Sequence, residues 1–155
     1  MKSPQQIGFT LIELTTVLVI LGILSAYIAP KFASKSTFSE HTFFSDTLNA
    51  IRYAQKLAVS TGCNVQVSIS SNSYILTRQG TNSSLTCSGS TYTLAIPHPS
   101  SGATDFSGSE PDVTLSSSVS PFYFHPLGTA SHDVTLTINS VKTIHVIAAT
   151  GLVYE

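Results

Sequence analysis

Apolar residues are concentrated near the start of the chain. Residues 9–29 form a run dominated by apolar side chains, and Glu13 is the one charged residue in it. An α-helix rises about 1.5 Å per residue, so this run would extend roughly 31 Å, close to the thickness of a bilayer core. The pattern therefore predicts a membrane-spanning helix over residues 9–29.

The pattern changes after residue 29. Over residues 30–62 apolar side chains recur every three or four positions, which is the spacing of an amphipathic helix with one buried face. The residues of that face are Phe44, Leu48, Ile51, Ala54 and Ala58. The opposite face carries Glu40, Asp46, Arg52 and Lys56, which we expect to be solvated. We expect this helix to continue the first as a stalk, to pack under a sheet and to end at Thr61 and Gly62.

From residue 63 onwards apolar and polar residues alternate. The alternation predicts a hairpin with strands at 63–69 and 74–78. Further strands are predicted at residues 91–96, 113–119, 122–124, 134–138 and 141–148, with a turn at Asn139 and Ser140. Residues 97–112 are rich in Pro, Gly and Ser and are predicted to form a long surface loop. The predicted fold class is α+β, with a long N-terminal helix packed on an antiparallel β-domain at residues 63–155.

The composition is poor in charge. Charged residues make up 10% of the chain, against about 25% in typical soluble domains. Ser and Thr number 25 and 19, so hydroxyl groups cover surface that Lys and Glu usually cover. This suits a domain outside the cytoplasm or one packed among copies of itself. A formal net charge of −1 argues against nucleic-acid binding, which usually needs a clear excess of Lys and Arg.

The apolar run does not match a cleaved secretory signal peptide. Signal peptidase requires small residues at alternate positions before the cut. Between Gly22 and Pro30, no two residues spaced two apart are both small. We therefore expect the run to stay on the mature protein.

A simple membrane anchor leaves Glu13 unexplained. A carboxylate at the centre of a membrane helix costs about 2.5 to 3.5 kcal/mol, so it usually has a partner. No Lys, Arg or His occurs between Lys2 and Lys31. The candidate cation inside the segment must then be a new N-terminus, created by cutting just before the segment, and Gly8 immediately precedes Phe9.

The segment from Gly8 to Leu14, GFTLIEL, resembles the cleavage and methylation signature of type IV pilins and pseudopilins. The resemblance implies that residues 1–8 are a leader peptide. It also implies that a prepilin peptidase cuts between Gly8 and Phe9 and methylates the new N-terminus at Phe9.

The same resemblance assigns a role to Glu13. It matches the family's glutamate, and the Phe9 ammonium of a neighbouring subunit would neutralise it when helices bundle in a filament. N-methylation leaves that positive charge in place. Pro30 lies where many pilins carry a helix-kinking proline, and Gly22 is a second flexible point at which the helix can bend.

Three further features are similar to the GspH and FimT subgroup of minor pilins and pseudopilins. They are the Ala54-x-x-x-Ala58 spacing before a helix that ends at glycine, the segment Phe122-Tyr123-Phe124-x-Pro126-x-Gly128, and the pair Thr150-Gly151. The two Cys and the many Phe also resemble minor pilins of mannose-sensitive haemagglutinin pilus systems. The resemblance implies a type IV pilin-like fold and a subunit that acts in filament initiation or at the tip.

The resemblance implies a location and partners as well. The subunit would stand in the inner membrane with a single pass and its C-terminal domain in the periplasm. It would contact lipid, the prepilin peptidase and the inner-membrane assembly platform before it joins other pilin or pseudopilin subunits. The sequence leaves open whether the subunit is major or minor, and whether the filament is a type IV pilus or a type II secretion pseudopilus.

Two alternative functions remain open. One is a minor pilin that binds DNA, and the other is a membrane-anchored periplasmic enzyme. Leu152 and Glu155 argue against the first, because neither supplies the cation that phosphate contacts require. Neither Gly-x-Ser-x-Gly nor Ser-x-x-Lys occurs in the chain, which argues against the second.

Cys63 and Cys87 can form a disulfide or remain two buried thiols. A bond would close a loop of about 25 residues and stabilise the domain by about 3 to 3.5 kcal/mol in the chain-entropy model. Oxidation is the default outcome in the periplasm.

No cofactor and no metal are expected. The five histidines lack the spacing of metal ligands, and they are His41, His98, His125, His132 and His145. Asp105, Glu110 and Asp112 could offer carboxylate oxygens to Ca²⁺, but the EF-hand spacing is absent. A solvated acidic loop is the simpler interpretation of these three residues.

Overall fold

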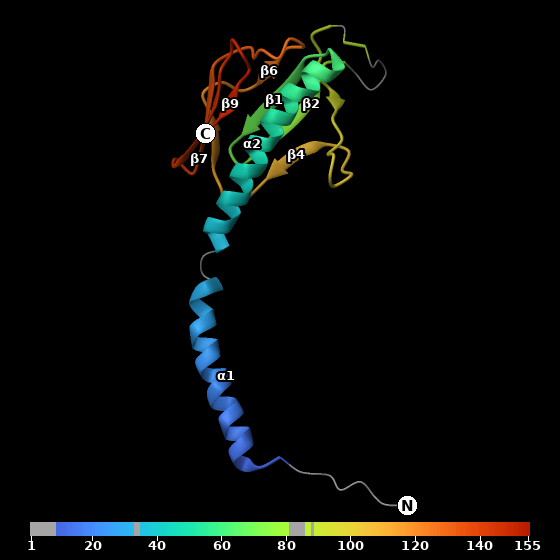
Figure 1. Ribbon diagram of the computed structural model, residues 1–155. Coiled ribbons are helices and arrows are strands. Elements are labelled where there is room, and N and C mark those ends of the chain that lie inside the picture. Colours follow the sequence, from blue (N-terminus) through green and yellow to red (C-terminus); the bar gives the residue numbers. More distant parts are fainter. Residues whose placement is uncertain (1–8, 33–34, 81–85, 88) are drawn as a thin grey trace, which may run out of the picture. The chain divides into compact units, whose positions relative to one another are not determined.

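The computed structural model describes residues 9–32, 35–80, 86–87 and 89–155, and for residues 27–32 and 35–37 it describes the backbone only (Figure 1). The chain divides into two compact units, residues 1–36 and 37–155. Helix α1 (Leu11–Phe32) lies in the first unit, and most of helix α2 (Lys35–Thr61) lies in the second. The helical backbone of α1 includes both Gly22 and Pro30. Within the described residues, no helix combines the length and the hydropathy needed to cross a membrane.

The second unit contains two antiparallel sheets. The first sheet has the order β3-β2-β1-β6, and β4 also pairs with β2. Its strands are β1 (Val65–Ser70), β2 (Ser73–Arg78), β3 (Leu94–Ala95), β4 (Phe106–Ser109) and β6 (Phe122–Phe124). The second sheet has the order β5-β7-β8-β9. Its strands are β5 (Leu115–Ser117), β7 (Val134–Ile138), β8 (Lys142–Val146) and β9 (Val153–Tyr154).

The two predicted hairpins are confirmed. Strands β1 and β2 pair from Val65↔Arg78 to Ser70↔Ser73, and β7 and β8 pair from Val134↔Val146 to Ile138↔Lys142. The turn of the second hairpin has φ values of 49° at Asn139 and 59° at Ser140. Two consecutive positive φ values are typical of the tight turn that matches the twist of a hairpin.

The prediction of a loop over residues 97–112 is wrong in one part. Residues 106–109 form β4, which pairs with β2 from Leu76↔Phe106 to Ser73↔Ser109. The missed strand reads Phe-Ser-Gly-Ser, so it has a single apolar side chain and no alternation to detect. Its main chain pairs with an edge of β2, and this edge is brought to it only by the tertiary fold. The short β3 pairs with the remainder of that edge, at Thr77 and Arg78.

Helix α2 packs against both sheets, and Figure 1 shows it lying across β1 and β2. The predicted apolar face is buried, and Phe43, Thr47 and Ala50 are buried with it. Ala50, Ala54 and Ala58 have no exposed surface, and their small side chains allow a close approach to the sheets. The larger core residues, of which Phe122, Phe124, Leu136 and Ile144 are fully buried, each contribute about 1.5 to 3 kcal/mol by leaving water.

The polar side of α2 holds the C-terminal segment. Arg52 Nη2 donates to the carbonyl oxygen of Val153 at 3.2 Å. Gln55 Nε2 donates to the carbonyl oxygens of Gly128 at 2.9 Å and of Thr150 at 3.3 Å. Gly151 lies between these contacts with a φ of +64°. The face that we expected to be solvated is exposed at Asp46, Arg52 and Lys56, and through Arg52 it also holds the C-terminal segment to the helix.

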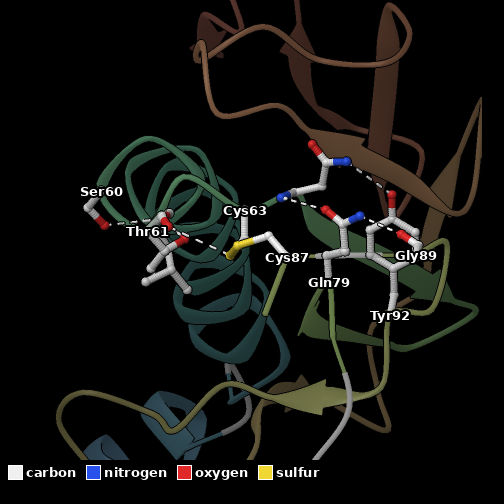
Figure 2. Close-up of a disulfide and its surroundings, with 9 residues drawn as sticks. Ser60, Thr61, Cys63, Gln79, Cys87, Gly89 and Tyr92 are labelled. Carbon is white, nitrogen blue, oxygen red and sulfur yellow. Dashed lines mark hydrogen bonds between the residues drawn. A yellow bond between two sulfur atoms is a disulfide. The ribbon is translucent and has the colours of Figure 1, made fainter. Parts of the chain in front are cut away.

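A disulfide joins Cys63 to Cys87, with their Cα atoms 5.1 Å apart (Figure 2). Cys63 is buried directly after α2, and Cys87 is exposed. Gln79 reinforces the bridge, because its side chain accepts a hydrogen bond from Asn64 N and donates one to Gly89 O (Figure 2). The disulfide and Gln79 together fasten the segment around Cys87 to the end of α2 and the start of β1.

Replacement of Gly151 by Ala is expected to destabilise the second unit. The new Cβ would collide with the carbonyl oxygen of Gly128 and would lie 2.6 Å from Gln55 Nε2. We expect a loss of about 3 kcal/mol in the free energy of unfolding, from left-handed strain together with overpacking. Gly102→Ala is the matched control, since Gly102 has a φ of +68° but no atom within 4 Å of its Cβ position. It should lose only about 1 kcal/mol. Urea unfolding of the full chain in detergent micelles measures both values, and equal losses would contradict the collision.

Removal of the disulfide is also expected to destabilise this unit. The two cysteines are 24 residues apart, so the double variant Cys63→Ser, Cys87→Ser should lose about 3 kcal/mol of unfolding free energy. The wild-type chain in a reducing agent is the control and should unfold at the midpoint of the double variant. Full reactivity of both thiols in the unreduced, native chain would show that the bond does not form.

Candidate functional site

The expected processing site lies at the start of the described chain. Gly8 lies outside the described residues, while Phe9 lies two residues before the start of α1 at Leu11 and is 83% exposed. Thr10 caps the helix, because the amide of Glu13 donates to Thr10 Oγ1 at 3.3 Å and the amide of Leu14 donates to Thr10 O at 3.2 Å. A threonine cap satisfies amide groups that the first turn of a helix leaves free.

The cap determines where Glu13 stands. Glu13 is the acidic residue of the first turn of α1, at the third position after the capping threonine. A carboxylate is favoured there by the partial positive charge of the helix N-terminus. Within the described residues, the Glu13 carboxylate takes part in no hydrogen bond or ion pair, and the residue is exposed. The group therefore remains available to an external cation.

The surface of α1 is more apolar than its composition indicates. Every described side chain from Phe9 to Ala26 is exposed. Three hydroxyls on this surface donate to carbonyl oxygens of the helix itself, Thr15 to Ile12, Thr16 to Glu13 and Ser25 to Leu21. Such internal bonds remove the need for water around these hydroxyls. A Cβ at Gly22 would meet no atom within 4 Å, so this glycine makes no close contact.

The residues considered for metal binding do not gather. Within the described part of the chain, no three His, Cys, Asp or Glu side chains are placed to hold a metal ion, and Asp105, Glu110 and Asp112 are no exception. The histidines instead have neighbours of other kinds, among them Lys142 for His41, Phe106 for His98, Tyr123 for His125, Ser131 for His132, and Thr135 and Tyr154 for His145.

The C-terminal segment is the place where DNA binding was considered. Leu152 is 56% exposed and Glu155 is exposed, so the segment presents an apolar and an acidic side chain. The nearby guanidinium of Arg52 is directed to the carbonyl oxygen of Val153. This arrangement adds no support to a phosphate-binding site.

Sequence reasoning missed two features of these regions. The Thr10 cap had a detectable signal, since Thr-x-x-Glu before an apolar run is the pattern of a capping box. The contacts of Arg52 and Gln55 with the C-terminal segment left no detectable signal in the sequence. They join residues about one hundred positions apart, and no local pattern records such a pairing.

Two family models match the chain. The model of the Type II transport protein GspH matches residues 45–151, and that of the prokaryotic N-terminal methylation motif matches residues 4–29. The first match covers most of the second unit. The second covers the expected cleavage site and most of α1.

Two Pseudomonas aeruginosa proteins are similar to the chain. Type II secretion system core protein G is 43% identical over 54 residues, which are 35% of this chain and 38% of that protein. The chain therefore matches well under half the length of this relative. The crystal structure of the type IV minor pilin FimU aligns with a TM-score of 0.50 at 13% identity, over 76% of this chain and 90% of that one. At this identity the likeness establishes the fold alone.

The comparisons and the structure agree. The fold is the predicted α+β fold, with a helix packed on antiparallel sheets in the manner of a minor pilin. Pilins and pseudopilins are structural, non-enzymatic proteins, so the family match supports a structural role. The chain belongs to the GspH family of type II transport proteins, the minor pseudopilins, and carries at its N-terminus the methylation motif of prepilins.

Proposed function

We propose that the chain is made as an inner-membrane prepilin, cut between Gly8 and Phe9, methylated at Phe9, and assembled through its N-terminal helix into a filament. The observation that carries the proposal is the methylation-motif match over residues 4–29, which coincides with a helix whose described side chains, up to Ala26, are exposed. In this proposal residues 1–8 are the leader and residues 9–29 cross the membrane before assembly. The prepilin peptidase is the first partner.

The exposed surface of α1 supports a change of environment during assembly. Side chains such as Leu11, Ile12 and Leu18 are 81%, 70% and 60% exposed, and an apolar surface of this extent requires lipid or other helices to cover it. Lipid would cover it in the inner membrane, and neighbouring pilin or pseudopilin subunits would cover it in the filament. An inner-membrane assembly platform would supply the work of transfer, while Gly22 and Pro30 let the helix bend.

Glu13 would set the register of neighbouring subunits. Its carboxylate is exposed in the first turn of α1, and the processed N-terminus at Phe9 carries a positive charge that methylation preserves. In a bundle of α1 helices, the ammonium of one subunit can pair with the carboxylate of the next. Because unpaired charges are costly in apolar surroundings, this pairing favours one axial stagger over the others.

The finer identity of the filament is also part of the proposal. The GspH family match supports a type II secretion pseudopilus, and the FimU-like fold is compatible with a type IV pilus. A subunit of either filament would act in initiation or at the tip. The two Cys and the many Phe residues keep a mannose-sensitive haemagglutinin pilus among the candidates.

Substitution of Gly8 by Phe is expected to block processing. A bulky residue next to the scissile bond would prevent the peptidase from reaching it, so the leader would stay attached. Mass spectrometry of the membrane-extracted protein measures the result. Gly22→Ala is the control and should be processed normally, since a Cβ at Gly22 meets no atom within 4 Å. Removal of the leader from the Gly8→Phe protein would show that the cut lies elsewhere.

Substitution of Glu13 by Val is expected to spare processing and impair assembly. The variant loses the partner of the N-terminal ammonium, and a charged hydrogen bond of about 1.5 to 3 kcal/mol corresponds to a loss of tenfold or more in incorporation. Quantitative immunoblotting, which compares the amount of the variant in sheared filaments with the amount in the membrane, measures this incorporation. Glu155→Val, at the other end of the chain, is the control. Wild-type filament yield from Glu13→Val would refute the register role.

A further inference from the structure

A hollow of about 480 Å³ opens between α2 and β4, which lies beside that helix (Figure 1). It forms where the edge of β2 changes its partner from β3 to β4, because the loop between those strands leaves the sheet at that point. Its lining includes the polar or aromatic side chains of Asp46, Asn49, Tyr53, Tyr74, His98 and Phe106. We call this hollow the Asp46 pocket. Among the described residues that line it, none belongs to the processing or assembly segment.

Helix α2 presents three polar side chains to the pocket. Asp46, Asn49 and Tyr53 are three and four residues apart, so they lie along one stripe of the helix. Within the described residues, none of these three side chains takes part in a hydrogen bond or an ion pair. The pocket therefore offers a carboxylate, an amide and a phenol whose bonding capacity is unused.

Aromatic rings form the walls. The rings of Tyr53 and Phe106 stack with centroids 5.1 Å apart, and those of His98 and Phe106 stack at 4.4 Å. Tyr74 packs so closely on Gly108 that a Cβ at residue 108 would lie 2.5 Å from Tyr74 Cζ. Glycine at this position thus leaves room for the Tyr74 ring beside the pocket.

The loop that closes the pocket is held in shape by its own hydrogen bonds. His98 Nδ1 accepts from the amides of Ser100 and Ser101, both at 3.3 Å. The His98 amide in turn donates to Ala103 O at 2.9 Å. These bonds orient the His98 ring against Phe106, so this wall exists before any ligand arrives. A preformed wall lowers the ordering cost of binding.

Asp46 is the one Asp, Glu, Lys or Arg among the described residues that line the pocket. Arg78 lines a different hollow, of about 280 Å³, which also borders Tyr53. Burial, and to a smaller extent the charge of Asp46, raises the pKa of Tyr74 to about 12. The Tyr74 hydroxyl is therefore protonated at physiological pH, and it adds no negative charge to that of Asp46.

The carboxylate of Asp46, which has no ion-pair partner among the described residues, indicates which class of ligand the pocket favours. A charge-assisted hydrogen bond is about twice as strong as a neutral one, and aromatic faces attract cations as well as alkyl chains. A neutral saccharide could use the rings and the amide but would leave the charge of Asp46 unmatched. We propose that the Asp46 pocket binds a lysine or arginine side chain of a partner protein, with the cation at Asp46 and the alkyl stem along Tyr53.

This proposal is independent of the pairing between Glu13 and Phe9. It concerns the second unit, and it can be tested on the unassembled chain in detergent micelles. The probes are α-acetyl-lysine N-methylamide and its arginine counterpart, added to the isotope-labelled protein and followed by amide NMR. We expect saturable shifts at Asn49, Ser100 and Ser107. The norleucine counterpart has the same stem without the ammonium and should cause none.

Three variants locate the binding. Asp46→Asn keeps the shape of the side chain and removes its charge, so affinity for both probes should fall about tenfold. Tyr53→Leu should weaken binding about threefold, because the alkyl stem of the probe loses the aromatic ring along which it packs. Glu155→Gln removes an exposed carboxylate outside the pocket and should leave affinity unchanged. The spectrum of each variant also reports whether the fold is intact.

Several results would overturn the assignment. Absence of shifts with the lysine and arginine probes at their highest soluble concentration would exclude a cation site, as would equal affinity of Asp46→Asn. Saturable binding of methyl glucoside at the same amides, without binding of the cations, would assign the pocket to saccharides. Tighter binding of free 1,4-diaminobutane than of the capped residues would assign it to polyamines rather than to a protein side chain.

Discussion

The packing of α2 against two sheets is the contact on which the folded domain depends. Ala50, Ala54 and Ala58 are fully buried along one stripe of the helix, in a core that also contains residues of strands from both sheets. The disulfide begins directly after the helix at Cys63, and the C-terminal segment is tied to its other side by Arg52. Because this stripe belongs to a core to which both sheets contribute, a substitution in the stripe would also disturb the disulfide and the C-terminal segment.

Helix α1 shows the opposite arrangement. Its described side chains from Phe9 to Ala26 are exposed, and the hydroxyls of Thr15, Thr16 and Ser25 bond to its own carbonyl groups. A helix of this kind gains little from being placed in water, and its stability depends on lipid or on other helices. The second unit is therefore organised around α2, whose apolar face is buried within one subunit, while the proposed filament is organised around α1, whose described side chains are exposed. In the proposed filament Glu13 would select one axial register between neighbouring α1 helices, because apolar contacts alone select no register.

Local patterns predicted the elements that bury alternate or periodic side chains. The hairpins of β1 with β2 and of β7 with β8 were found in this way, because every second residue of those strands faces the core. Strand β4 escaped prediction because its place in the sheet comes from main-chain pairing with β2. Arg52 is exposed as expected, but its hydrogen bond escaped prediction for a related reason, since the acceptor, Val153 O, lies about one hundred residues further along the chain.

The sequence by itself determined the family, the processing motif, the α+β class and the buried face of α2, because each of these is written in local spacing or in a contiguous motif. Only the tertiary structure decided which loops α2 holds, how residues 106–109 complete the first sheet and how Asp46 comes to face the rings of Tyr74 and Phe106. These features join residues that are tens of positions apart in the chain. Their geometry depends on strand order and on the path of one loop, and neither follows from the periodicity of side chains.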